Sequence, residues 1–314
     1  MGRIISRLSC LLSIGVLAAS VAVPAQQPPA TTVAAEPLAH FHHVHLNSAD
    51  PDAAIAFFTT RFASERAAFR GSRSDAGVPA VWAQKSWLFF DKVAQAPPSE
   101  IVSALYHIGW GAEDMKAEAR RQLDMGSVLE TPLTDAVDIF GAGVRDRNFF
   151  MYVQSPERAL IEVQTATHHN FMHVHMLSDD PVAAADWYEK EFRLIRRNQP
   201  LRTPRVFGGI PTGPAASLAV DNVTFWWYPT AHARAIYPKA WDGRTAYASN
   251  RGRVIDHVAL SVDRLDETIA RLRQDGVTVV GRPADTMGGR MRSVFVKGPD
   301  NAEIELVEIH AKQP

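Results

Sequence analysis

The sequence contains a single cysteine, Cys10, among its 314 residues. If the N-terminal segment is removed, no disulfide, no thiolate nucleophile and no cysteine-based metal site remain possible. The chain also has no long hydrophobic run: the apolar stretch 11–23 is shorter than the roughly 20 residues that a spanning helix needs. The net charge is close to zero, because 33 Lys and Arg residues balance 34 Asp and Glu residues, and both signs are mixed along the chain. Such a balance argues against a nucleic-acid partner or an anionic membrane surface.

The start of the chain has the layout of an export signal. Arg3 and Arg7 precede the apolar run, and small residues around Ala25 match the positions that a signal peptidase recognises. We therefore expect a signal peptide at 1–25, a periplasmic or secreted protein, and no stable membrane insertion after cleavage. An uncleaved anchor helix is the alternative. Residues 26–38, rich in Pro, Ala and Thr, are expected to be a flexible leader.

An internal repeat is the main feature of the remaining chain. The stretch FHHVHLNSADPDAAIAFF begins at Phe41, and FMHVHMLSDDPVAAADWY begins at Phe171, 130 residues later. Identical residues fall at Phe41/Phe171, His43/His173, Val44/Val174, His45/His175, Ser48/Ser178, Asp50/Asp180, Pro51/Pro181, Ala53/Ala183 and Ala54/Ala184. A match of this extent indicates an internally duplicated chain.

Each copy begins with an alternating strand, followed by Asp-Pro, which is typical of a helix start with proline at the first helical position. Short strands follow, and a more distant version of the same pattern occurs later in each copy. We therefore predict four βαβββ modules, at 40–95, 104–166, 170–230 and 254–310. The predicted fold class is α+β, with consecutive modules pairing into two tandem open β-barrel domains at 39–168 and 169–314.

Two further stretches resemble a known family. IDHVALSVDRLDETIARLRQDG and VFVKGPDNAEIELVEI, in the last module, are similar to the vicinal oxygen chelate superfamily of glyoxalases, extradiol dioxygenases and bleomycin-resistance proteins. The resemblance covers nearly all of the chain after the leader. It implies paired βαβββ modules, with metal ligands that point inward from the first and last strands of the modules.

The resemblance also places the metal ligands. First-strand histidines fall on His43, His107, His173 and His257, and last-strand glutamates fall on Glu162 and Glu305. Pairing consecutive modules gives one set of His43, His107 and Glu162 and another of His173, His257 and Glu305. Two histidines and one carboxylate leave open positions on a divalent metal, with Fe, Mn, Zn and Ni as candidates. The alternatives are histidines packed in a core and a duplicated site of which one half is no longer loaded.

His45 and His175 lie two residues after the first ligands, so strand alternation places them on the same face. They are candidate catalytic residues that orient ligands or carry protons, or else wall residues bonded to a neighbour.

Tyr152 is a weaker catalytic candidate, because it occupies the position of a tyrosine that extradiol dioxygenases use together with a histidine. No histidine lies at 143–145, and the second half has Phe295 at the tyrosine position, so ring cleavage of catechols by the usual route is in doubt. His232, from the long segment 229–253, is one possible substitute, as are the tyrosines of that segment.

Two hypotheses follow. The leading one is a metal-dependent enzyme that acts on a small oxygenated molecule, by dioxygenase or by glyoxalase-like lyase or isomerase chemistry. The alternative is a non-catalytic protein of the bleomycin-resistance type that binds a small molecule. A monomer and a homodimer are both compatible with four modules in one chain.

Overall fold

The computed structural model describes residues 38–71, 73–136 and 148–309. The predicted signal peptide, 1–25, and nearly all of the predicted leader lie outside the described residues, so cleavage and export remain predictions. Among the described residues, no helix has the length and apolar character required to cross a membrane.

The four predicted βαβββ modules and the α+β class are confirmed. Module one contains β1 (His40–Ser48), α1 (Pro51–Arg61), β2 (Glu65–Phe69), β3 (Val78–Ala83) and β4 (Ser86–Lys92). Module two contains β5 (Leu105–Ala112), α2 (Met115–Asp124), β6 (Leu129–Asp135), β7 (Phe149–Gln154) and β8 (Leu160–Thr165). Module three contains β9 (Phe171–Ser178), α4 (Pro181–Phe192), β10 (Leu201–Phe207), β11 (Ile210–Val220) and β12 (Val223–Pro229). Module four contains β13 (Ile255–Ser261), α6 (Leu265–Gln274), β14 (Val279–Thr286), β15 (Met291–Lys297), the 3-10 turn η1 (Pro299–Asn301) and β16 (Glu303–Glu308).

The repeated Asp-Pro pair starts a helix in both copies. The Asp180 carboxylate accepts hydrogen bonds from the backbone N–H groups of Val182 (3.1 Å) and Ala183 (3.0 Å), and Asp50 caps α1 in the same way. These bonds satisfy N–H groups that a helix leaves without an internal partner, and the proline that follows needs no such partner.

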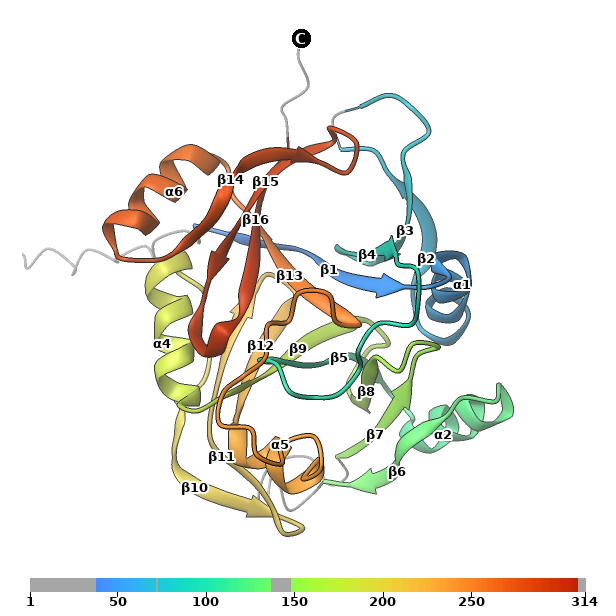
Figure 1. Ribbon diagram of the computed structural model, residues 1–314. Helices are drawn as coiled ribbons and strands as arrows, with labels where there is room; N and C mark the ends of the chain where they lie inside the picture. The colour runs from blue at the N-terminus through green and yellow to red at the C-terminus, as the bar shows by residue number, and fades with distance from the viewer. Residues whose placement is uncertain (1–37, 72, 137–147, 310–314) are drawn as a thin grey trace, which may run out of the picture. The chain divides into compact units, whose positions relative to one another are not determined.

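The pairing of the modules differs from the prediction (Figure 1). One eight-stranded sheet has the order β14-β15-β16-β13-β1-β4-β3-β2, so module one pairs with module four. The other has the order β10-β11-β12-β9-β5-β8-β7-β6, so module two pairs with module three. We call them the 1–4 sheet and the 2–3 sheet. The predicted pairing of consecutive modules is therefore wrong, and the predicted boundary at 168/169 falls within the 2–3 sheet.

Connection length explains the pairing. Modules two and three are joined by the short segment 166–170, which allows β9 to lie antiparallel beside β5. Longer segments, 93–104 and 230–254, lead the chain from one sheet to the other. Elements joined by short connections are usually neighbours in space, and here the shortest connection joins modules that share a sheet.

The two faces of each central strand serve different purposes. In β1, Val44 and Leu46 face the main apolar core, and in β9 Val174 and Met176 do so. Side chains alternate along a strand, so the histidines between and beside these residues point to the opposite face. The main core draws residues from both sheets, as in the contact of Phe41 with Phe171, whose ring centroids are 5.9 Å apart. Burying each large side chain contributes roughly 1.5–3 kcal/mol.

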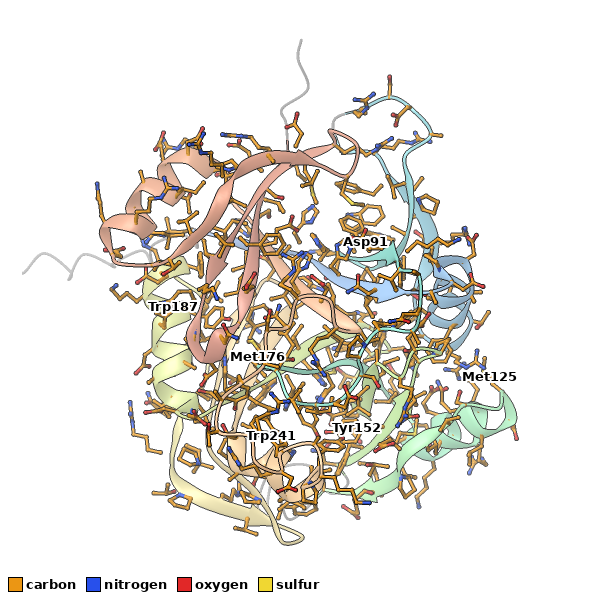
Figure 2. The ribbon with its side chains drawn as sticks, viewed as in Figure 1. Asp91, Met125, Tyr152, Met176, Trp187 and Trp241 are labelled. Carbon is orange, nitrogen blue, oxygen red and sulfur yellow. The ribbon has the colours of Figure 1, made fainter. Side chains whose placement is uncertain are left out.

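The long segment 229–253 contains a helix, because α5 (Thr230–Ile236) follows β12 directly. The segment packs on the 2–3 sheet through a second apolar cluster, in which Trp241 of the segment and Tyr152 of β7 are both members (Figure 2). The indole N–H of Trp241 also donates to the carbonyl oxygen of Ile101 at 2.8 Å.

Candidate metal centres

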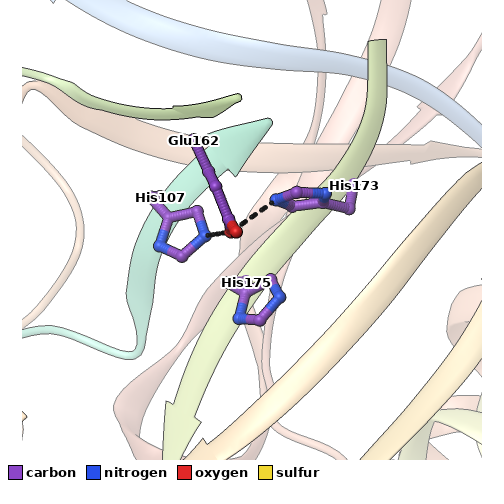
Figure 3. A group of neighbouring side chains, drawn as sticks. All are labelled: His107, Glu162, His173 and His175. Atoms are coloured by element: carbon purple, nitrogen blue, oxygen red, sulfur yellow. Dashed lines mark hydrogen bonds and ion pairs between the residues drawn. The ribbon is translucent and has the colours of Figure 1, made fainter. Parts of the chain in front are cut away.

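The 2–3 sheet brings together four side chains that can ligate a metal, shown in Figure 3: His107, Glu162, His173 and His175. Each offers one ligand atom, and these atoms all lie within 4.8 Å of one another. Glu162 Oε2 is 2.8 Å from His107 Nε2 and 3.2 Å from His173 Nε2. We call this group the 2–3 centre.

The 1–4 sheet contains an equivalent group, which we call the 1–4 centre: His43, His45, His257 and Glu305. Ligand atoms of the three histidines lie within 4.8 Å of one another. Glu305 Oε2 is 3.3 Å from His43 Nε2 and 3.1 Å from His257 Nε2. All four side chains are buried.

The structure thus brings together the six predicted ligands, but divides them differently from the prediction. Glu162 shares its site with His107 and His173 rather than with His43, and Glu305 shares its site with His257 and His43 rather than with His173. The correction follows from the sheet order, because β5 pairs with β9 and β1 pairs with β13.

His45 and His175 lie inside these clusters. The sequence did not decide between a role beside the ligands and a place in the wall. Each faces an aromatic residue across a parallel strand pair, His45 opposite Phe89 and His175 opposite Trp226. Glu162 and Glu305 occupy the matching strand position in modules two and four, where they face Gly109 and Ala259. In modules one and three, the last strand has an aromatic residue at this position, and a histidine of the first strand faces it. In modules two and four, the last strand has a glutamate at the same position.

Protonation at the 2–3 centre suits a cation. Burial lowers the pKa of His107 to about 4 and lowers that of His175 well below its ordinary value. Burial alone would raise the pKa of Glu162, but its hydrogen bonds with His107 and His173 outweigh this effect and hold the pKa well below its ordinary value. Neutral imidazoles and an ionised carboxylate are the forms that bind a divalent metal.

Unpartnered nitrogens give a test of fit for a metal. In the 2–3 centre, Nδ1 of His107, Nδ1 of His173 and Nδ1 of His175 are buried and make no hydrogen bond. Buried polar atoms normally have a partner, and leaving one unpaired costs about 1–3 kcal/mol. Three imidazoles and one carboxylate, whose ligand atoms lie within 4.8 Å of one another in the 2–3 centre, fit a divalent ion of the first transition series.

Asp256 is a residue that the sequence analysis missed. His257 Nδ1 donates to Asp256 Oδ1 at 2.6 Å, and the carboxylate also accepts from Arg251 and Asn47. Neighbours on a regular strand point to opposite faces, but the register of β13 against β1 shifts at this point and leaves Asp256 as an extra residue. The bulge lets Asp256 reach the ring of the next residue, where it orients His257 so that Nε2 faces Glu305.

The 2–3 centre has phenols instead of this carboxylate. Tyr106 is the extra residue of the corresponding bulge in β5, and its ring lies 4.3 Å from that of His107. Tyr152, the weaker catalytic candidate, is buried with its ring 5.0 Å from that of His107. Burial raises the pKa of Tyr152 well above its ordinary value, so this phenol stays protonated at neutral pH and can donate a hydrogen bond but does not act as a base.

A cavity opens beside the 2–3 centre. Its volume is about 370 Å³. Glu162 and Tyr152 line it together with Tyr228, His232 and Ile236, the last two from α5. Other lining residues are Thr131, Thr134, Phe150, Phe207, Gly208, Ile210 and Thr212. The wall is mainly apolar with a few polar groups, which is typical of a small-molecule site.

Gly109 leaves space for the ring of His173, and we expect Gly109→Ala to disrupt the 2–3 centre. A Cβ atom at this position would lie 2.1 Å from Nε2 and from Cε1 of His173, far inside contact distance. The buried ring would have to move, so we expect metal affinity at this centre to fall by at least about 10-fold, the lower range for loss of a ligand-orienting contact. Isothermal titration with Zn²⁺ measures the effect, with Glu130→Gln, at an exposed carboxylate on β6 of the same sheet, as a control. Equal zinc binding by the Gly109 variant and the wild type would contradict this role.

Comparisons with known proteins agree with this architecture. Residues 170–306 match the family model described as the Glyoxalase/Bleomycin resistance protein/Dioxygenase superfamily. A lactoylglutathione lyase of Salmonella typhimurium is 32% identical over 96 residues, which cover 31% of this chain and 58% of that protein. A lactoylglutathione lyase of Escherichia coli O157:H7 is 27% identical over 139 residues, covering 44% of this chain and 90% of that protein.

Solved structures show the same fold over most of the chain. Glyoxalase I from Zea mays aligns with a TM-score of 0.60 at 14% identity, covering 86% of this chain and 92% of that one. A putative dioxygenase from Bacillus subtilis aligns with a TM-score of 0.56 at 11% identity, covering 88% and 87%. The family match places residues 170–306 in the superfamily of glyoxalases, bleomycin resistance proteins and dioxygenases, and the likeness to solved structures shows that the fold extends over most of the chain.

Proposed function

We propose that the protein is a metal-dependent enzyme that acts on a small oxygenated molecule in the cavity beside Glu162. One observation carries the proposal: Glu162 belongs both to the four-residue metal-ligating group and to the wall of an apolar cavity of about 370 Å³. A molecule in that cavity would lie directly against the 2–3 centre. Lyase, isomerase and dioxygenase chemistry all remain compatible with this arrangement.

The residues of the 2–3 centre have separable tasks. His107, His173 and His175 would hold a divalent ion, which as a Lewis acid supplies stabilisation of negative charge on a substrate oxygen. Glu162 is ionised and balances the charge of the site. Tyr152 can donate a hydrogen bond to a substrate oxygen, because its phenol remains protonated. The apolar walls from Phe150, Ile210 and Ile236 keep water away from the reacting groups.

The test is turnover by protein loaded separately with Ni²⁺, Zn²⁺, Mn²⁺ or, without oxygen, Fe²⁺. The substrates are the adduct of methylglyoxal with glutathione, suggested by the names of the relatives, and a panel of catechols, hydroxyquinones and keto acids with oxygen uptake recorded. We expect Glu162→Gln to lower kcat/KM for any active substrate by at least about 10-fold, because the neutral amide no longer balances the charge of the site. Glu130→Gln, an exposed carboxylate on β6 of the same sheet, is the matched control.

No turnover and no oxygen uptake with any metal, combined with tight binding of a substrate analogue, would replace this proposal with the non-catalytic alternative. The apolar cavity is what would serve such a binding protein.

We also propose that the protein is exported, on the strength of the basic start, the apolar run and the small residues around Ala25. Cell fractionation with N-terminal sequencing tests this. A mature N-terminus at Gln26 is expected, and full-length protein in the cytoplasm would contradict it.

A further inference from the structure

His232 lies outside both metal centres, yet its surroundings are those of a reactive group. It lies on α5 and is 6% exposed. Its Nδ1 is 2.8 Å from the carbonyl oxygen of Pro211. A carbonyl oxygen can only accept, so Nδ1 carries the hydrogen, and in the neutral ring Nε2 carries the lone pair. That Nε2 is buried and has no hydrogen-bond partner.

The cavity joins His232 to the 2–3 centre, because His232 and Glu162 line the same space. The titratable groups around His232 are the phenols of Tyr228 on β12 and Tyr106 on β5, with ring centroids 4.9 and 5.5 Å away, and the more distant Glu162. The charges of His107 and His175 also reach it through space. Burial raises the pKa values of both phenols, so they are neutral hydrogen-bond donors and not bases.

Resting on the proposed function, we propose that His232 is the base that takes a proton from a substrate held in this cavity. The substrate O–H bond breaks, its electron pair stays on the oxygen, and the proton bonds to Nε2. The carbonyl oxygen of Pro211 continues to accept from Nδ1 and stabilises the resulting imidazolium. Proton return from Nε2 to the product restores the enzyme.

The surroundings of His232 suit both the uptake of a proton and its retention until it returns to the product. Burial lowers the pKa of His232, so Nε2 is unprotonated and available at neutral pH. The hydrogen bond to Pro211 and the charge of Glu162 act in the opposite sense and favour the protonated form once the proton arrives. Glu162 itself is engaged with His107 and His173, which leaves His232 as the free base among the described residues that line the cavity.

The experiment uses the full chain loaded with Zn²⁺, which has no redox chemistry, and 4-nitrocatechol, whose visible absorption changes as each phenol proton is lost. The spectrum of the bound probe is recorded against pH for wild type, His232→Asn and His232→Gln. In His232→Asn the side-chain amide can still donate to Pro211, but no nitrogen remains at the Nε2 position. His169→Asn, at an exposed histidine that does not line this cavity, is the control. Zinc content and thermal midpoint are measured for every variant.

In the wild type we expect the fully deprotonated probe to appear at lower pH than in His232→Asn and His232→Gln, by about one pH unit or more, a tenfold change in the equilibrium. Superimposable pH profiles in wild type and both variants, with equal zinc content, would overturn the role of His232 and leave the proposed function intact. A probe that fails to bind the zinc-loaded wild type, or that binds Glu162→Ala equally well, would overturn the proposed function and this inference with it.

Discussion

Replacing His173 with alanine is expected to remove the metal that binds with Glu162 and to leave in place the metal that binds with Glu305. Pairing consecutive modules would make His173 a partner of Glu305, whereas in the structure its Nε2 is 3.2 Å from Glu162. The protein should lose about one metal equivalent per chain, because the remaining side chains of the 2–3 centre lack one nitrogen ligand. Elemental analysis after dialysis against a weak chelator measures it.

Double variants make this prediction decisive. In a Glu162→Ala background, His173→Ala should remove no further metal, because that site is already lost. In a Glu305→Ala background it should remove the remaining equivalent. Residues that act in one site show this non-additive pattern, whereas residues of separate sites add. His169→Ala, an exposed histidine close to β9, should leave both equivalents bound. The reverse pattern in the two backgrounds would rule out the pairing of modules two and three.

Stripping the metal is expected to lower the thermal midpoint of the protein substantially. Glu162 and Glu305 are 7% and 3% exposed, and a buried carboxylate is costly without a cation or strong hydrogen bonds. An ion that binds only the folded state at about 100 times its Kd contributes about 2.7 kcal/mol per site, so two sites contribute roughly 5 kcal/mol. For a chain of more than 250 residues, about 1.5–2 °C per kcal/mol predicts a decrease of the order of 10 °C.

Differential scanning calorimetry of the wild type, with and without chelator, measures this change. Glu162→Ala and Glu305→Ala should each lose about half of the metal-dependent shift, and the double variant should not respond to added metal. A double variant that is still stabilised by metal as strongly as the wild type would show that the ion binds elsewhere.

Much of the local structure could be predicted from the sequence. The Asp-Pro pairs mark the starts of α1 and α4 because capping and proline geometry involve only neighbouring residues. The period of two along β1 and β9 separates core residues such as Val44 and Val174 from the histidines beside them. The six ligand positions followed from the family resemblance, module by module.

Asp256 and Gly109 could not be found in this way. Asp256 reaches His257 through a bulge in the register between two strands, and a bulge depends on the partner strand as well as on the residue. Gly109 matters because a ring from β9 occupies the space above it, and that contact exists only after β5 and β9 have paired.

The sequence by itself determined the four modules and the starts of α1 and α4, because these depend on residues close together in the chain. The family resemblance implied which histidines and glutamates face inward. The tertiary structure decided which modules share a sheet, and so which histidine meets which glutamate. Four similar modules present nearly the same edge strand to one another, so local patterns are compatible with more than one pairing. The short connection 166–170 and the longer segments 93–104 and 230–254 select the observed one, in which β1 lies beside β13 and β5 beside β9.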